Sequence, residues 1–170
     1  MDGVKAGFVL FVAALLQLAV LSEYAAFRTA SIVLVALLAV ALLRGSIFGA
    51  VAGFGTGLVL DSATLGTLGV TSLLLTVFGF WIGRYGETTA RDRFHAPFLS
   101  VAVVTVLYGV GQLLLQFVLG EPAPAGLLVD GLPVALLVNL LLTLPVYALI
   151  RRLFPPLELG DRVREVRLLG

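Results

Sequence analysis

The sequence predicts an all-α polytopic membrane protein, a bundle of six helices, and three observations support this fold class. Of the 170 residues, 60% are hydrophobic and only 12% are charged, whereas ordinary soluble domains carry about 25% charged residues. The apolar residues fall into six segments that are separated by charges, prolines and glycines. Within one segment, glycine recurs at every fourth position. A normal aqueous surface is therefore excluded.

The six segments define the expected transmembrane domain. They cover residues 4–21, 30–43, 46–60, 67–83, 97–119 and 132–154, with a turn-rich connection before the last. The first is expected to remain in the protein, because no Ala-x-Ala cleavage site follows it. We therefore predict a six-span domain over residues 1–154 and a short cytoplasmic tail over residues 155–170.

The second and third segments are short. Helices of about 14 to 16 residues rise about 21 to 24 Å, against about 30 Å of hydrocarbon. Two arrangements remain open: a tight hairpin whose ends thin the bilayer or are covered by protein, and a re-entrant hairpin. A single fused helix is not expected, because Arg44 would lie near its middle.

Basic residues predict the orientation. With six spans, one side of the membrane receives ten of the eleven Lys and Arg residues, and the other side receives only Arg28. The ten are Lys5, Arg44, Arg84, Arg91, Arg93, Arg151, Arg152, Arg162, Arg164 and Arg167. The positive-inside rule then places both termini in the cytoplasm.

The third segment carries the clearest packing signal. Gly45, Gly49, Gly53 and Gly57 form a glycine stripe, and the next step of four reaches Asp61. In lipid such a segment is helical despite its glycines, because the backbone must satisfy its own hydrogen bonds. Positions without side chains let a second helix approach at backbone distance. The stripe therefore predicts a helix-packing or partner interface.

Polar residues inside the apolar segments have two interpretations. Tyr108, Gln112 and Gln116 are spaced by four and share one helix face, while Gln17 and Asn139 lie in the first and last segments. Tyr108, Gln112, Gln116 and Asn139 could line an outward cavity. Interhelical hydrogen bonding is the interpretation we favour, since such side chains commonly join membrane helices.

Charged residues at the segment ends are expected to cap helices or to contact lipid headgroups. Asp61 is expected to cap a short helix beginning near residues 64–66, or to pair with a partner chain. The loop 84–95 is expected to be a solvated connection at anionic headgroups, with docking to a cytoplasmic partner as the alternative.

Composition argues against several chemistries. The chain has no cysteine and one histidine, His95, so thiolate metal sites and cysteine nucleophiles are excluded. No His/Asp/Glu constellation indicates an enzyme, a metal site or a cofactor. The basic residues form no patch for nucleic acid.

The region from Arg44 to Val70 resembles the rod shape-determining protein MreD family. The residues that carry this resemblance are Leu42-Leu43-Arg44-Gly45, Gly49-x-x-x-Gly53-Phe54-x-x-Gly57-Leu58-x-x-Asp61 and Leu65-Gly66-x-x-Gly69-Val70. Elsewhere only the hydropathy is similar.

The resemblance implies a non-enzymatic subunit of the bacterial cell-elongation machinery in the cytoplasmic (inner) membrane. Its partners would be MreC, which spans the membrane once, and, directly or indirectly, MreB, RodA and its penicillin-binding protein. The glycine stripe would receive either a helix of its own bundle, which we favour, or the membrane helix of MreC.

The resemblance also implies a fold shared with the substrate-binding subunits of energy-coupling-factor transporters. Those six-helix bundles have an outward pocket and dock through an Ala-x-x-x-Ala pattern that the run Ala13 to Ala19 lacks here. A vitamin-binding transporter subunit is therefore the alternative function. It predicts a saturable ligand, whereas an assembly subunit predicts a co-purifying membrane protein.

Overall fold

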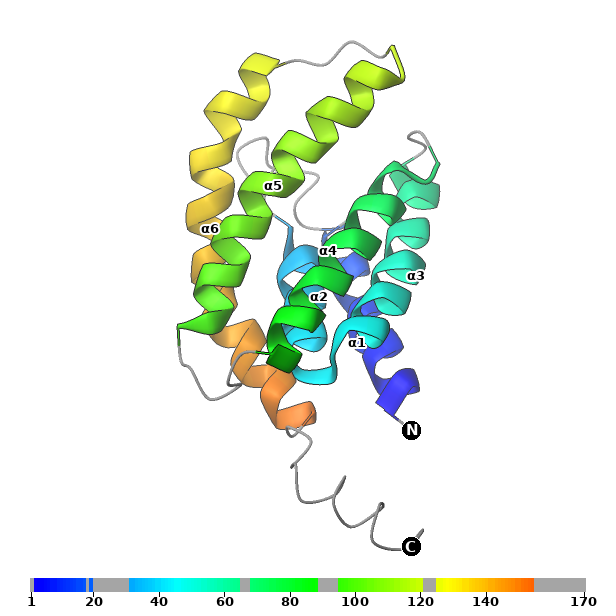
Figure 1. The fold of residues 1–170 in the computed structure, drawn as a ribbon, viewed down its shortest axis with the longest axis vertical. Helices are drawn as coiled ribbons and strands as arrows, with labels where there is room; N and C mark the ends of the chain where they lie inside the picture. Colours follow the sequence, from blue (N-terminus) through cyan, green and yellow to red (C-terminus); the bar gives the residue numbers. More distant parts are fainter. Residues whose placement is uncertain are drawn as a thin grey trace, which may run out of the picture.

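The computed structural model describes residues 2–17, 19, 31–64, 68–88, 95–120 and 125–154, which form six α-helices without a strand among them (Figure 1). The helices are α1 (Asp2–Leu16), α2 (Ile32–Arg44), α3 (Ser46–Thr64), α4 (Val70–Thr88), α5 (Ala96–Val118) and α6 (Ala125–Leu153). The all-α prediction is confirmed. The predicted tail, 155–170, lies outside the described residues.

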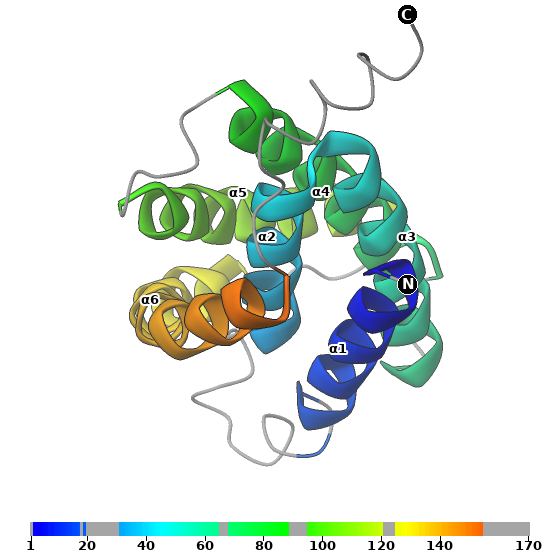
Figure 2. The same ribbon diagram turned by 90° about the horizontal axis from the view of Figure 1, so that it is seen from below.

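Helix α2 lies at the centre of the bundle. Every residue from Val33 to Leu43 is buried, and α2 contacts each of the other five helices, as Figure 2 shows. Its 13 residues rise only about 20 Å, but protein rather than lipid surrounds them. Protein therefore covers this short helix. Whether the α2–α3 hairpin is spanning or re-entrant stays a prediction.

The C-terminal end of α2 is fixed by local contacts. At its end, Gly45 has φ 98°, a left-handed conformation that favours glycine, and α3 begins at the next residue. The Arg44 guanidinium lies 5.1 Å from the centre of the Phe154 ring at the end of α6, within cation–π range. Gly45 therefore serves a tight turn between α2 and α3.

Three predicted helix boundaries are wrong. Helix α3 continues to Thr64, so the third segment, which was expected to be short, has 19 residues. Helix α6 begins at Ala125, inside the predicted turn-rich connection, because an apolar segment in lipid satisfies its backbone most readily as a helix, even with Pro133 inside it. Helix α4 continues to Thr88, so the first part of the predicted loop 84–95 is its last turn. Residues 89–94 of that loop lie outside the described residues.

The surface of the bundle is apolar. Phe8, Ile47, Trp81, Phe117 and Leu141 are each more than 60% exposed, a pattern suited to lipid rather than to water. Three stretches are long and apolar enough to cross a membrane, Ser46–Ala63, Ala96–Val118 and Gly131–Leu153, and two shorter apolar helices are present. Six full crossings, with both termini in the cytoplasm, stay a prediction.

Candidate functional site

The glycine stripe of α3 packs against α4. A methyl group built on Gly49 would overlap the backbone of Gly79, and one on Gly53 would overlap the backbone of Leu75. At Gly57 the overlap is with Ser72. The two antiparallel helices therefore meet backbone to backbone, and the residues that lack side chains make this possible.

Helix α4 contributes its own glycines to this contact. Gly79 faces Gly49, Gly83 faces the backbone of Gly45 and Ser46, and Gly86 faces Leu42 at the end of α2. These three glycines were not predicted to lie at the contact, although the spacing Gly79-x-x-x-Gly83 was a visible signal. Of the two occupants considered for the stripe, the structure has a helix of the same chain. This face of α3 leaves no open surface for a helix of MreC.

Asp61 caps the beginning of α4. It is 3% exposed. Its Oδ2 accepts hydrogen bonds from the Gly69 and Ser72 backbone N–H groups at 2.8 and 3.2 Å, and its Oδ1 accepts one from Thr71 at 3.2 Å. A carboxylate at a helix N-terminus also interacts favourably with the helix dipole. The capping role was predicted, but the helix begins at Val70, later than the predicted 64–66.

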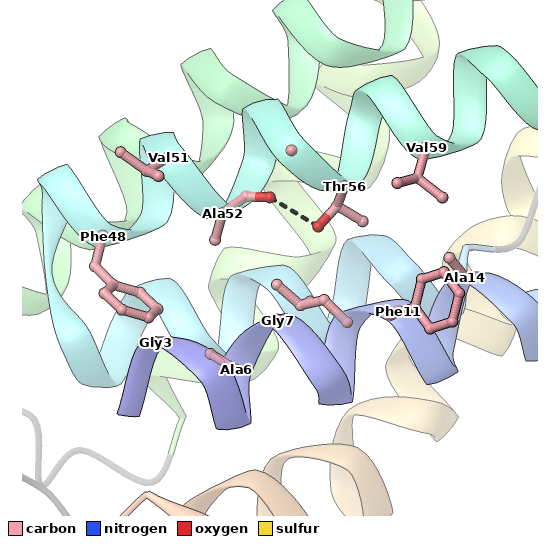
Figure 3. Close-up of a pocket in the computed structure, with 12 residues that line it drawn as sticks. Gly3, Ala6, Gly7, Phe11, Ala14, Phe48, Val51, Ala52, Thr56 and Val59 are labelled. Carbon is pink, nitrogen blue, oxygen red and sulfur yellow. Dashed lines mark hydrogen bonds between the residues drawn. The ribbon is translucent and has the colours of Figure 1, made fainter. Parts of the chain in front are cut away.

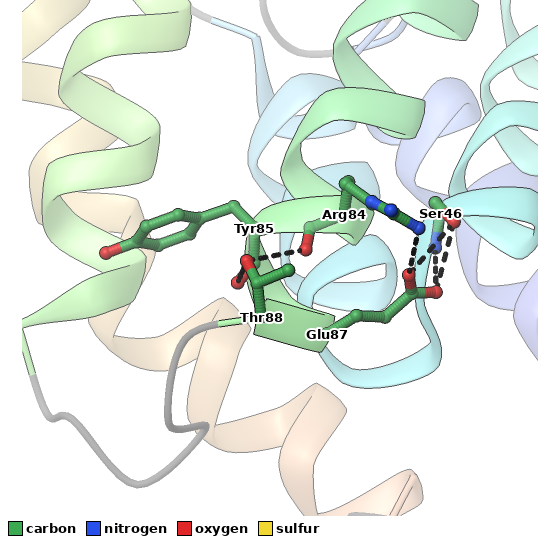
Figure 4. Close-up of polar contacts among 5 residues, drawn as sticks. All are labelled: Ser46, Arg84, Tyr85, Glu87 and Thr88. Carbon is green, nitrogen blue, oxygen red and sulfur yellow. Dashed lines mark hydrogen bonds and ion pairs between the residues drawn. The ribbon is translucent and has the colours of Figure 1, made fainter.

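Glu87 makes the corresponding contact at the opposite end of the hairpin (Figure 4). Its Oε1 accepts from the Ser46 N–H at 2.8 Å and from the Ser46 hydroxyl at 3.0 Å, at the first residue of α3. Arg84 lies 3.8 Å from Oε2. Each helix of the hairpin thus supplies a carboxylate from its last turns to the first turn of the other. This role of Glu87 was not predicted, because the residue was expected to lie in a solvated loop.

A buried polar cluster joins α1, α2, α5 and α6. Gln17 Oε1 accepts from the Ser31 hydroxyl and from Val33 N–H, both at 3.0 Å. Asn139 Oδ1 accepts from Ser31 N–H at 2.9 Å, and its Nδ2 donates to Thr105 Oγ1 at 3.1 Å. Buried N–H groups at a helix start need such acceptors. Asn139 and Gln17 therefore connect helices around the beginning of α2.

Two of the three polar residues that were predicted to share a face of α5, Tyr108 and Gln112, contact each other. Gln112 Nε2 donates to the Tyr108 hydroxyl at 3.0 Å, and the Tyr108 ring meets Phe78 edge-to-face at 6.4 Å. Gln116 lies one turn further along and is half-buried. A cavity lined by Tyr108, Gln112, Gln116 and Asn139 stays a prediction.

A family model described as rod shape-determining protein MreD matches residues 4–154, from the first turn of α1 to the residue after α6. The chain belongs to the MreD family. It is therefore a rod shape-determining membrane protein that takes part in the rod-shape complex, as the sequence resemblance indicated. No curated protein and no solved structure matches the chain. A fold shared with energy-coupling-factor subunits stays a prediction.

The described polar groups of this MreD protein make contacts between helices. The Asp61 and Glu87 carboxylates accept backbone N–H bonds. Among the described residues, no group of three His, Cys, Asp or Glu side chains could hold a metal ion. This arrangement holds both ends of α3 and both ends of α4 in place, together with the face at which the two helices meet.

Proposed function

We propose that the chain is a non-enzymatic assembly subunit of the elongation machinery, which binds MreC in the cytoplasmic membrane and helps guide lateral peptidoglycan synthesis. The observation that supports this most is the α3–α4 contact, in which glycines along the helices and a carboxylate at each end of the hairpin hold the two helices together. Such a rigid hairpin suits a protein that works by holding neighbours. Membership of a shape-determining family supports the same reading. MreB, RodA and its penicillin-binding protein are proposed as direct or indirect partners.

A partner helix would meet the outer faces of this bundle. The stripe is filled by α4, whereas large apolar side chains are exposed on α3, α5 and α6. Val51 is 68% exposed, Val103 47% and Leu141 74%. Lipid tails are as apolar as these side chains, so the association of helices in the membrane has no hydrophobic driving force. A partner is therefore expected to recognise one of these faces by its shape.

Co-purification tests the proposal. The tagged chain is expressed with MreC of the same bacterium, extracted in mild detergent, and compared with Val51→Trp, Val103→Trp and Leu141→Trp variants. We expect MreC to co-purify with the wild-type chain, and one tryptophan variant to reduce its yield about tenfold through lost packing, while the other two serve as controls. Absence of MreC from the wild-type sample, or a tightly bound vitamin in its place, would contradict the proposal.

A further inference from the structure

A small cavity lies between α2, α5 and α6, and we call it the α2–α5–α6 cavity. Leu38 and Leu42 on α2, Ser100 on α5 and Thr143 on α6 are among the residues that line it. Each of these side chains belongs to a residue that is at most 4% exposed. The cavity therefore lies inside the bundle, away from the surface that faces lipid.

The cavity has room for one water molecule. Its volume, measured as the space open to the centre of a sphere the size of water, is about 10 Å³. Wherever the centre of such a sphere fits, the whole sphere fits, so a water molecule is accommodated without movement of the walls. A buried water also needs polar groups to which it can bond. The side chains that can supply them are the hydroxyls in the lining, those of Ser100, Thr143 and Tyr147.

The Ser100 hydroxyl is a buried donor that its own helix does not use. Other helical hydroxyls of this chain donate to the carbonyl one turn earlier, as Thr56 does to Ala52 at 2.7 Å (Figure 3). Within the described part of the chain, Ser100 Oγ is buried and has no hydrogen-bond partner. Because an unsatisfied buried hydroxyl is unfavourable, a partner inside the cavity would stabilise it.

Thr143 supplies an acceptor on the opposite wall. Helices α5 and α6 run antiparallel (Figure 1), and Asn139 on α6 donates to Thr105 on α5 at 3.1 Å. Ser100 lies five residues before Thr105, and Thr143 lies four residues after Asn139. Ser100 and Thr143 therefore stand at nearly the same level along the two helices. Thr143 Oγ1 donates to the Asn139 carbonyl at 2.7 Å, and its oxygen lone pairs can still accept.

We propose that the α2–α5–α6 cavity binds one water molecule, which accepts a hydrogen bond from Ser100 and donates one to Thr143. The water joins α5 to α6 about one turn beyond the direct contact between Asn139 and Thr105. It also satisfies the Ser100 hydroxyl, which the hydrocarbon of a lipid could not do. The site needs no partner protein, so it is separate from the assembly role.

Solid-state NMR of the full chain in lipid bilayers tests the site. Magnetisation transfer from water protons is measured at isotope-labelled methyl groups of Leu38, which lines the cavity. Val40 is the internal control, because it is 0% exposed and lies on the opposite face of α2. We expect transfer at Leu38 and none at Val40. In Ser100→Ala we expect the transfer at Leu38 to fall about tenfold, the change that loss of one hydrogen bond gives.

Two further variants complete the test. Thr143→Val keeps the shape of the side chain but removes the acceptor, so we expect a similar fall, and it carries the test if Ser100→Ala does not fold. Ser62→Ala makes the same substitution at an exposed position of α3 and is expected to leave the transfer unchanged. Absence of transfer at Leu38 in the wild-type chain, or equal transfer at Leu38 and Val40, would overturn the proposal. So would full transfer in both cavity variants, or an equal fall in Ser62→Ala.

Discussion

Replacing Gly53 with alanine is expected to destabilise the protein by about 3 kcal/mol, the upper part of the range for overpacked interiors. The added methyl group would overlap the Leu75 carbonyl and the Thr76 nitrogen on α4. Backbone atoms cannot move aside as a flexible side chain can, so the two helices must separate. That separation also weakens the contacts of Gly49 and Gly57, which share the interface.

Gly55→Ala is the matched control for this change. It lies two residues away on the same helix and makes the same substitution, but the new methyl group meets nothing within 4 Å. Its expected effect on the free energy of unfolding is within about 1 kcal/mol of zero, and on the stabilising side from helix propensity. Thermal unfolding in mild detergent measures both variants. Equal stability of the two would show that the stripe does not hold α3 to α4.

Asp61→Ala is expected to have an effect of similar size, a loss of about 2–4 kcal/mol. The substitution leaves the Gly69, Thr71 and Ser72 N–H groups without their carboxylate acceptor. Loss of a helix cap costs about 1 kcal/mol, and the Ser72 N–H, whose bond to Asp61 is the buried one of the three, costs about 1–3 kcal/mol more when it is left unsatisfied. Because Ser72 also faces Gly57, fraying of this turn would loosen the stripe.

Two variants separate capping from general damage at this end of α3. Ser62→Ala removes an exposed hydroxyl that donates only to the Leu58 carbonyl of the preceding turn, and its expected cost is below about 0.5 kcal/mol. Asp61→Asn keeps one acceptor oxygen, so we expect an intermediate loss. Chemical unfolding of the purified chains gives the order. If Asp61→Ala were as stable as Ser62→Ala, the cap would have no energetic role.

The glycine stripe was visible in the sequence because its cause is local: residues without side chains recur at the helical period. The helix that packs on the stripe was harder to predict. Gly79 and Gly83 show the same spacing of four as Gly49 and Gly53, and only a comparison of the two pairs indicates that two helices without side chains at these positions could meet. Gly55 belongs to the same glycine run, yet it lines an apolar groove between α1 and α3. Helical spacing separates these two faces, but it does not say what covers each of them.

The central position of α2 could not be predicted. An apolar helix has the same sequence character whether lipid or protein surrounds it, because both are equally apolar. The polar residues around it were the available signal. Gln17 and Asn139 bond to the first turn of α2, but their common partner, Ser31, lies just before that helix and carries no distinctive pattern.

Intramolecular pairing of α3 with α4 is the central claim, and a distance between two spin labels tests it most directly. The chain has no cysteine, so Ile47→Cys on α3 and Trp81→Cys on α4, 78% and 64% exposed in the wild-type chain, would be the only labelled sites. We expect one narrow distance distribution that persists when the doubly labelled chain is diluted into excess unlabelled chain and when MreC is added. Disappearance of the distance on dilution, or a longer distance with MreC, would show that another chain occupies the glycine stripe.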